Sequence, residues 1–297
     1  MATLAKRLDG LPLALVIAGS YMRQTGMSPS KYLELYCQSW GNLQKGAQPH
    51  RYYSNGNLAS TWMISYQEIE KNIPSAAKLL LLLACYDNQD IWYDLIYEGL
   101  QDDNKPGWLY ESVCSEINFS LTIQALMDFS LIQVKPALGS YSLHPVVQDW
   151  CQSYMQEKND KDKMMGIAIM STGFSVSSSD KPQYWILQKR LLPHADRMFK
   201  EIQNKESLEQ LTMVDSVHRL GSLYMDQGKL QEAEAMYQRA LTGYEKALGP
   251  DHTSALNSVH CLGILYSDQG KLQEAEAMYQ RALTGYEKAL GPDHTST

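Results

Sequence analysis

The feature that most constrains the fold is a long internal repeat. The segment DQGKLQEAEAMYQRALTGYEKALGPDHTS occurs twice, at residues 226–254 and 268–296, with a shift of 42 residues. Repeats of this length are typical of solenoids, in which each unit buries its apolar face against its neighbours. The C-terminal part of the chain is therefore predicted to be a stacked array.

Each copy has the pattern of a helical hairpin. The first helix carries the sequence LGxxY and ends near Gly228, because a glycine in the left-handed conformation commonly follows a helix. The second helix places alanines and tyrosines on one face at helical spacing and ends at Gly249 and Pro250. Asp251 or Thr253 can then cap the next helix. Small residues should let the helices approach closely: Gly221, Ala233 and Ala240.

This pattern resembles the tetratricopeptide repeat. The 42-residue period and the RAL and YEKALGPDH segments resemble the subtype found in kinesin light chains, and the resemblance covers residues 214–297. It implies an α-solenoid that binds a protein or peptide ligand in a groove lined by the first helices. By resemblance, the groove residues are Asp215, His218, Ser222, Met225 and Asp226 in the first unit, and Asn257, His260, Ile264, Ser267 and Asp268 in the second.

The two units differ at five positions, all of them in the first helix. The second helix and the loop are identical in residues 214–254 and 256–296, so the scaffold is unchanged while one face varies. This favours recognition through the first helices, and chance drift after a recent duplication is the alternative. The differing pairs are Val214/Leu256, Asp215/Asn257, Arg219/Cys261, Ser222/Ile264 and Met225/Ser267.

Two units are few for a solenoid, which usually needs three or more. The amphipathic residues 184–202 are expected to act as a degenerate cap before the first unit, and the array is expected to be cut after the second. The last helix should then leave Tyr279, Leu283 and Tyr286 partly uncovered. We therefore expect modest stability and self-association through this face.

The preceding residues predict a second helical region, so the fold class is mainly all-α. Helices at 58–72, 75–85, 92–100 and 119–130 precede two alternating segments, 131–135 and 140–143, that predict a hairpin, and Pro145 opens a final helix. This order is typical of a winged helix. The predicted domains are a helical pair (1–40), a linker (41–57), a winged helix (58–157), connecting helices and cap (158–212) and the repeats (213–297).

A winged helix often reads DNA, but this one lacks the necessary charges. The helix predicted at 119–130 contains no Lys or Arg, and none occurs between Lys105 and Lys135. Phosphate contacts need such residues. The formal net charge of -7, from 26 basic and 33 acidic residues, argues against nucleic acid and anionic membranes as partners.

Two short motifs suggest a different role for this region. GLPLAL at 10–15 and YSLHPVVQDW at 141–150 resemble a helix start and the Met-His-Asp motif in the NB-ARC domain of STAND proteins, a group that includes fungal NOD-like receptors. The resemblance implies that Pro12 packs on adenine and that His144 reaches the β-phosphate of ADP. The simpler alternatives are a helix opener for Pro12 and a strand-to-helix junction for His144. Pro145 replaces the aspartate of the motif.

Other sequence signals for chemistry are missing. No GxxxxGK[ST] loop is present, and the two Gly-Lys pairs, at 228–229 and 270–271, lie in repeat turns. No HExxH or GxSxG motif occurs, so we expect no catalytic residues and no enzyme activity. The five cysteines are scattered without a CxxC pair, which argues against a zinc site and favours a reducing, cytoplasmic location.

The sequence thus predicts a signalling and protein-interaction fragment of a NOD-like receptor, with a winged-helix lever and a tetratricopeptide sensor but no P-loop. The alternative is a free-standing adaptor similar to kinesin light chain. Residues 1–212 contain no sustained heptad repeat of the kind that precedes the repeats in those adaptors, which favours the receptor. No cofactor is expected; ADP or ATP would bind only alongside a P-loop domain.

The purified chain is expected to retain no ADP or ATP, because it has no loop to hold the phosphates. Chromatography of the supernatant after denaturation measures any released nucleotide. One nucleotide per chain would contradict this prediction.

Overall fold

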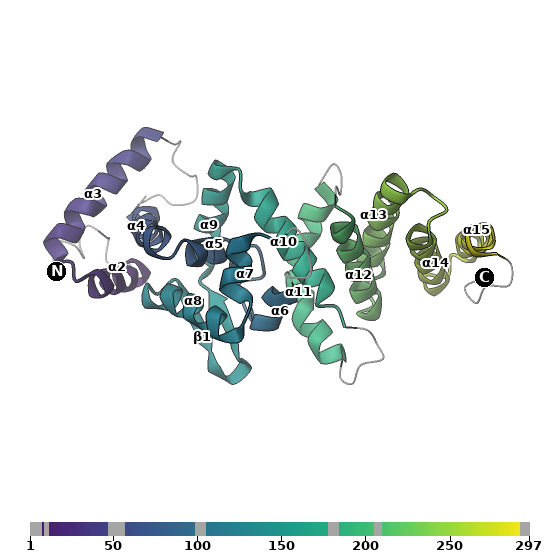
Figure 1. Cartoon of the computed structure of the whole chain (residues 1–297), viewed down its shortest axis with the longest axis horizontal. Helices are drawn as coiled ribbons and strands as arrows, with labels where there is room; N and C mark the ends of the chain where they lie inside the picture. The colour runs from purple at the N-terminus through teal and green to yellow at the C-terminus, as the bar shows by residue number, and fades with distance from the viewer. Residues whose placement is uncertain are drawn as a thin grey trace. The chain divides into compact units, whose positions relative to one another are not determined.

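A computed structural model describes residues 8, 12–46, 57–98, 105–177, 184–204 and 210–291. As the sequence predicted, these residues are mainly helical, with fourteen α-helices and one two-stranded hairpin (Figure 1). The chain divides into two compact units, the first made of residues 1–93 and 105–161 and the second of residues 94–104 and 162–297. Within the described ranges, no helix is both long enough and apolar enough to cross a membrane.

The first unit is built around α5. Its elements in chain order are α2 (Pro12–Thr25), α3 (Pro29–Gly46), α4 (Asn57–Asn72), α5 (Pro74–Leu83), α7 (Gly107–Val113), α8 (Glu116–Asp128), β1 (Ile132–Lys135), the 3-10 turn η2 (Pro136–Leu138), β2 (Ser140–Leu143) and α9 (Pro145–Lys158). Helix α5 carries five consecutive buried leucines and packs against α4, α7, α8 and α9. A helix that is apolar on all sides must be covered on all sides, so α5 forms the core of this unit.

Two glutamines of α9 donate hydrogen bonds to backbone carbonyl groups at the C-terminal end of α5. The last carbonyls of a helix have no partner within the helix. The Gln148 Nε2 group donates to the carbonyl oxygens of Ala84 (3.2 Å) and Tyr86 (2.7 Å), and Gln152 Nε2 donates to Ala84 (2.8 Å). These bonds join segments more than sixty residues apart in the sequence and fix α9 against the end of α5.

The predicted hairpin is confirmed within one residue. Strands β1 and β2 are antiparallel, with Ile132 opposite Leu143 and Lys135 opposite Ser140. Gly139 has a φ of 59°, which the tight turn requires and which glycine adopts without steric cost. Ile91 forms a bridge to Tyr141 through two backbone hydrogen bonds of 2.9 and 2.7 Å. The interpretation of these helices and this hairpin as a winged helix stays a prediction.

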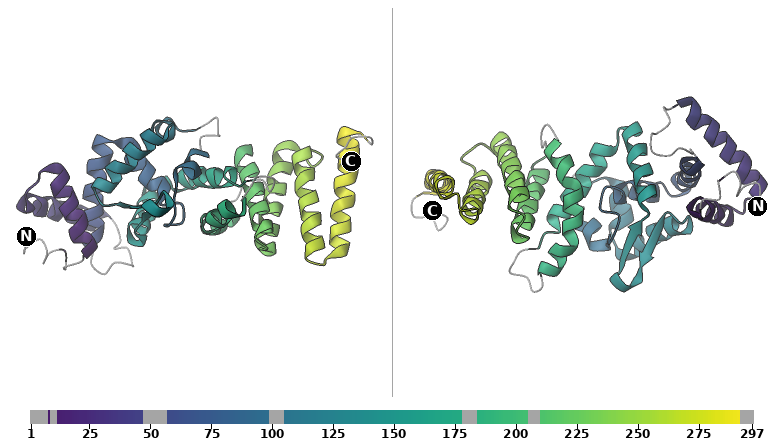
Figure 2. Two further views of the ribbon diagram at one scale, coloured as in Figure 1. Left: turned by 90° about the horizontal axis from the view of Figure 1, so that it is seen from below. Right: turned by 180° about the vertical axis from the view of Figure 1, so that it is seen from behind.

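The second unit contains the repeats. Its helices are α6 (Tyr93–Tyr97), α10 (Lys161–Phe174), α11 (Tyr184–Asn204), α12 (Leu211–Asp226), α13 (Leu230–Leu248), α14 (Thr253–Asp268) and α15 (Leu272–Leu290). Helix α12 pairs with α13 and α14 with α15, while α13 packs against α14. Figure 2 shows these four helices side by side in chain order.

The predicted turn chemistry is mostly confirmed. Gly228 and its counterpart Gly270 follow the first helices with φ of 71° and 75°. The cap before α14 differs from the prediction of Asp251 or Thr253. His252 holds that position, and its Nδ1 accepts a hydrogen bond from the backbone N–H of Ser254 at 3.2 Å. An imidazole nitrogen can therefore satisfy a free N–H in the first turn as a short polar side chain does.

The paired helices approach each other at glycines. A Cβ atom on Gly221 would lie 2.8 Å from the ring of Tyr237, and one on Gly263 would lie 2.7 Å from the ring of Tyr279. Gly243 meets Val214 in the same way, since a Cβ atom there would lie 2.8 Å from a methyl group of the valine. The expected close approach at Gly221 is therefore present in both repeats.

Two segments differ from the predicted elements. The helix expected at 92–100 is the five-residue α6, and residues 99–100 lie outside the described residues. Helix α7 begins at Gly107, between the helices predicted at 92–100 and 119–130, where no helix was expected. Pro106 and Gly107 resemble a turn locally, but Leu109 and Val113 are buried, which stabilises a helical turn against α5. Helix α3 continues to Gly46, into the predicted linker, of which residues 47–56 lie outside the described residues.

Gly173 and Gly166 of α10 provide a matched test of the close packing between α10 and α12. A Cβ on Gly173 would lie 2.6 Å from the backbone Cα of Ser216, whereas at Gly166 the nearest atom is the flexible end of Met213 at 3.1 Å. Gly173→Ala should lower the free energy of unfolding by about 1–3 kcal/mol through overpacking. Gly166→Ala should be neutral or stabilising, because alanine favours helix by about 1 kcal/mol.

Denaturant unfolding of the two variants measures this difference. Equal stability of Gly173→Ala and Gly166→Ala would show that α10 and α12 do not approach as described.

Candidate interaction surface

The ten predicted groove positions lie on the first helices, α12 and α14. In the first repeat, most of them contact the tyrosines of α13. The Tyr244 hydroxyl donates to Asp215 Oδ1 at 2.5 Å. Burial and the neighbouring Asp215 carboxylate raise the pKa of the Tyr244 phenol, so the phenol stays protonated at neutral pH and donates this bond. Asp215 is therefore held in place by the second helix of its own repeat.

His218 lies against the same two tyrosines. Its ring centroid is 5.2 Å from that of Tyr237 and 6.2 Å from that of Tyr244. Its Nε2 atom is buried without a hydrogen-bond partner among the described residues. Burial lowers the pKa of His218 to about 4, although the Asp215 carboxylate acts in the opposite direction. The imidazole is thus neutral at physiological pH.

Ser222, Met225 and Asp226 complete the first set. The Tyr237 hydroxyl donates to Ser222 Oγ at 3.1 Å and lies 3.9 Å from Met225 Sδ. Asp226 accepts from the buried Gln188 of α11 at 2.7 Å. These contacts join α12 to its neighbours on both sides, so in this repeat the predicted groove side chains also serve packing.

The second set is more accessible. Four of its five residues are exposed and Ile264 is half-buried; the exposed ones are Asn257, His260, Ser267 and Asp268. Ile264 has no polar group, so Tyr279 cannot form the bond that Tyr237 forms with Ser222. Of the five differences between the repeats, only Val214/Leu256 changes a buried side chain. The other four change side chains of the first helix that are exposed or half-buried. Helix α14 presents a set of side chains that a partner can contact directly.

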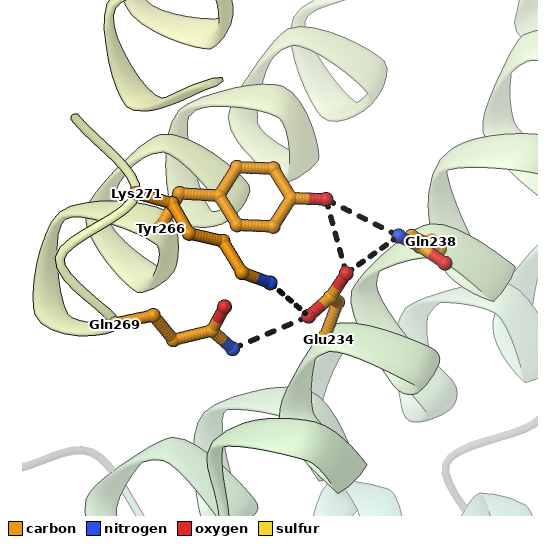
Figure 3. A network of polar contacts seen from close by, with 5 residues as sticks. All are labelled: Glu234, Gln238, Tyr266, Gln269 and Lys271. Carbon is orange, nitrogen blue, oxygen red and sulfur yellow. Dashed lines mark hydrogen bonds and ion pairs between the residues drawn. The ribbon is translucent and has the colours of Figure 1, made fainter. Parts of the chain in front are cut away.

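A polar network that the sequence did not indicate joins the two repeats (Figure 3). Glu234 of α13 accepts hydrogen bonds from Tyr266 (3.2 Å) and Gln269 (3.2 Å) and forms an ion pair with Lys271 (3.6 Å). Gln238 donates to Glu234 at 3.1 Å and to the Tyr266 hydroxyl at 3.2 Å. One carboxylate therefore gathers three donors from α14 and the turn after it.

The same arrangement precedes the first repeat. Lys229, the counterpart of Lys271, forms an ion pair with Asp196 of α11 at 2.7 Å, and the Asp196 carboxylate helps to raise the pKa of Tyr224, the counterpart of Tyr266. Burial is the larger cause of that rise. Helix α11 thus supplies the acid that α13 supplies one repeat later. The role of residues 184–202 as a degenerate cap stays a prediction.

The two residues predicted to face a nucleotide lie in the first unit. Pro12 is the first residue of α2 and is exposed. His144 is the N-cap of α9, where its Nδ1 accepts from the N–H of Val146 at 3.3 Å, and it is also exposed. Both residues hold the simpler positions that the sequence offered, a helix opener and a strand-to-helix junction. Their nucleotide-facing role stays a prediction.

No cluster of three or more metal-binding side chains occurs within the part of the chain that the structure describes. The five cysteines are not paired in disulfides among those same residues. Burial, with the neighbouring Cys85, raises the pKa of the Cys151 thiol. A buried thiol with a raised pKa is a poor nucleophile and a poor metal ligand.

Comparison with known families agrees with the geometry of the repeats. The family described as "Tetratricopeptide repeat" matches residues 213–288 and 254–297, so helices α12 to α15 form tetratricopeptide repeats. A family described as "Domain of unknown function (DUF7779)" matches residues 67–160, which include α5 and α7 to α9.

A longer similarity covers most of the chain. It is 27% identical over 264 residues to a nucleotide-binding leucine-rich repeat (NLR)-like protein of Hyaloscypha variabilis. The aligned region is 85% of this chain and 25% of that protein, so the chain spans about a quarter of its relative's length. No solved structure matches the chain.

The burial of His218 predicts a pH dependence of stability. The unfolded chain binds a proton below a pKa of about 6.5, whereas the folded chain keeps His218 neutral down to about 4. The unfolded state therefore binds more protons in this window, and stability should fall by up to about 3 kcal/mol as pH drops from 6.5 to 4. His218→Gln should remove this contribution.

Urea unfolding at several pH values measures the slope. The control is His260→Gln, which changes the equivalent but exposed side chain of the second repeat. The same slope in wild type and in His218→Gln would mean that another group carries the dependence.

Proposed function

We propose that this chain is a protein-interaction and signalling segment of a NOD-like receptor. In this proposal the tetratricopeptide repeats act as the sensor, and the first unit acts as a winged-helix lever of an NB-ARC module. The segment has no enzyme activity and acts in the cytoplasm. Without a P-loop, it binds no nucleotide by itself.

The extent of the similarity supports a receptor over an adaptor. The tetratricopeptide match begins at residue 213, whereas the similarity to the NLR-like protein extends over 264 residues. Most of the aligned residues must therefore lie before the repeats. A resemblance limited to a kinesin light chain array would not extend so far.

The observation that carries the proposed sensor role is the contrast between the helices of the two repeats. The second helices, α13 and α15, have the same sequence, LQEAEAMYQRALTGYEKAL. The first helices differ, and α14 exposes Asn257, His260, Ser267 and Asp268. Exposed side chains on a rigid helical scaffold are the usual basis of recognition by repeat proteins. We infer that a peptide or protein segment binds along α12 and α14.

The lever role rests on the junction at His144. Strand β2 ends at Leu143, and α9 begins at Pro145, so His144 alone separates the two elements. Its imidazole already binds the first turn of α9. In a receptor with a P-loop domain, the β-phosphate would accept a hydrogen bond from the Nε2–H group of His144 while Nδ1 keeps its bond to α9, which would couple the nucleotide to the position of α9. Pro12 would contact the adenine of the same nucleotide.

Arginines on α14 should weaken peptide binding. Asn257→Arg plus Ser267→Arg places two bulky cations on exposed positions of the proposed surface. Peptides selected from a displayed random library on the wild-type chain should bind this variant at least tenfold more weakly, a loss of about 1.4 kcal/mol or more.

Thr242→Arg plus Ala247→Arg is the matched control, because it adds the same charge at exposed positions of α13. Fluorescence anisotropy measures the affinities, and circular dichroism checks that helix content is unchanged. Equal affinities for the two folded variants would place the binding surface elsewhere.

A further inference from the structure

One side of helix α14 combines apolar and polar side chains. Asn257, Cys261, Ile264 and Asp268 are spaced by four, three and four residues, so they lie along one side of the helix. Asn257 and Asp268 are exposed, whereas Cys261 and Ile264 are half-buried. We call these four residues the α14 stripe. It is part of the proposed peptide-binding face of α12 and α14.

The middle of the α14 stripe is apolar. The Tyr237 hydroxyl, which lies 3.9 Å from Met225 Sδ of α12, also interacts with the Cys261 thiol of α14. Met225 and Cys261 are therefore neighbours across the two first helices, and Ile264 follows Cys261 by one turn. All three are half-buried, so each keeps apolar surface in contact with solvent. An apolar side chain of a ligand would remove this surface from water, which is favourable.

At the end of the α14 stripe, Asp268 is an acid without a partner. The other two aspartates among the proposed contact residues are held by the protein itself. Asp215 accepts a hydrogen bond from Tyr244. Asp226, the counterpart of Asp268, accepts one from Gln188. No hydrogen bond or ion pair reaches the Asp268 carboxylate from any of the described residues.

Helix α13 cannot supply Asp268 with a donor like Gln188. Asp196 of α11 and Glu234 of α13 hold equivalent positions, because they pair with equivalent lysines. Gln188 lies eight residues before Asp196. The position eight residues before Glu234 is 226, which precedes the start of α13 at Leu230. The second repeat therefore lacks the internal partner that the first repeat has.

The cations nearest to this end of the stripe are engaged elsewhere. Lys271 forms an ion pair with Glu234, and its Nζ lies 5.2 Å from the centroid of the Tyr266 ring. The guanidinium of Arg219 in α12 lies 5.3 Å from the centroid of the Phe174 ring, and cysteine takes the equivalent position in α14. Helix α14 itself contains no lysine or arginine.

The position of Asp268 in its helix adds to the negative charge. Asp268 is the last residue of α14. The C-terminal end of a helix carries a partial negative charge, so an acid there is unfavourable and a cation is favourable. Local arrangements that cost stability are expected mainly where function requires them. This end of the α14 stripe therefore favours a cation that a ligand supplies.

We propose that the peptide bound along α14 places an apolar side chain on Cys261 and Ile264 and a lysine or arginine at Asp268, two residues before or after the apolar one. The four residues from Ile264 to Asp268 span about 6 Å of helix. Two residues of an extended peptide span about 7 Å, and side chains two residues apart point to the same side. The apolar and charged contacts therefore form together.

This inference rests on the proposed peptide-binding face, to which it adds the chemical class of the ligand. Peptides selected on the full chain from a displayed random library serve as probes. Only those that bind Asn257→Trp plus Ser267→Trp more weakly than wild type are kept, because they occupy the proposed face. Tryptophan is neutral, so this choice favours no peptide charge. Sequencing of the kept peptides should show lysine or arginine two residues from an apolar residue.

A charge exchange tests the contact at Asp268. Asp268→Lys should weaken binding of the tightest kept peptide at least about tenfold, as should changing the basic residue of the peptide to glutamate. Combining both changes restores opposite charges, so affinity should return to within about threefold of the original pair. Glu287→Lys makes the same charge change at an exposed position near the end of α15 and should leave the affinity unchanged.

Fluorescence anisotropy measures the affinities, and urea unfolding checks the variants. Asp268→Lys should be at least as stable as wild type, because a cation suits the C-terminal end of a helix, so lost affinity would not come from unfolding. Kept peptides without the basic residue, or an affinity that Asp268→Lys leaves unchanged, would overturn this inference and leave the proposed binding face intact. If the two tryptophans weaken no selected peptide, the binding face itself is wrong and the inference falls with it.

Discussion

The close approach of paired helices at glycine is the constraint on which the repeats depend. Gly221 and Gly263 leave room for the rings of Tyr237 and Tyr279, and the ring then fills the space between the two helices. This packing also places the Tyr237 hydroxyl beside Ser222 and Met225, on the side of α12 predicted to face a ligand. The contact that stabilises the hairpin thus fixes part of the candidate interaction surface. An alanine at these glycines would move that surface as well as weaken the hairpin.

Between the repeats, polar contacts add to the apolar packing and align α14 on α13. The Glu234–Lys271 ion pair is partly exposed, and such pairs contribute at most about 1 kcal/mol. The hydrogen bonds from Tyr266 and Gln269 to Glu234, and from Gln238 to the Tyr266 hydroxyl, have defined directions and favour this alignment of α14 on α13. Asp196 acts similarly for α12. These acids therefore contribute more to alignment than to stability.

Local patterns predicted the helices and turns of this chain well, but not its long-range polar contacts. Gly228, Gly249 and the strand alternation around Pro136 are signals within a few residues, and the corresponding turns and hairpin are present. The partners Glu234 and Lys271 are separated by 37 residues, with no periodic signal linking them. Similarly, His218 and His260 occupy the same repeat position, yet His218 is half-buried with its Nε2 atom out of contact with solvent, whereas His260 is exposed. Its environment depends on the neighbouring helices and not on the repeat sequence.

Helix α8 shows how charge decides what kind of partner a common fold element can take. The sequence predicted this helix as part of a winged helix, a fold that often reads DNA, but phosphate binding requires cations that residues 106–134 do not contain. The same helix instead places Ile117 and Leu121 in solvent, where apolar side chains have a free-energy cost of exposure that contact with a protein removes. Acidic residues beside them exclude nucleic acid and favour a basic protein surface.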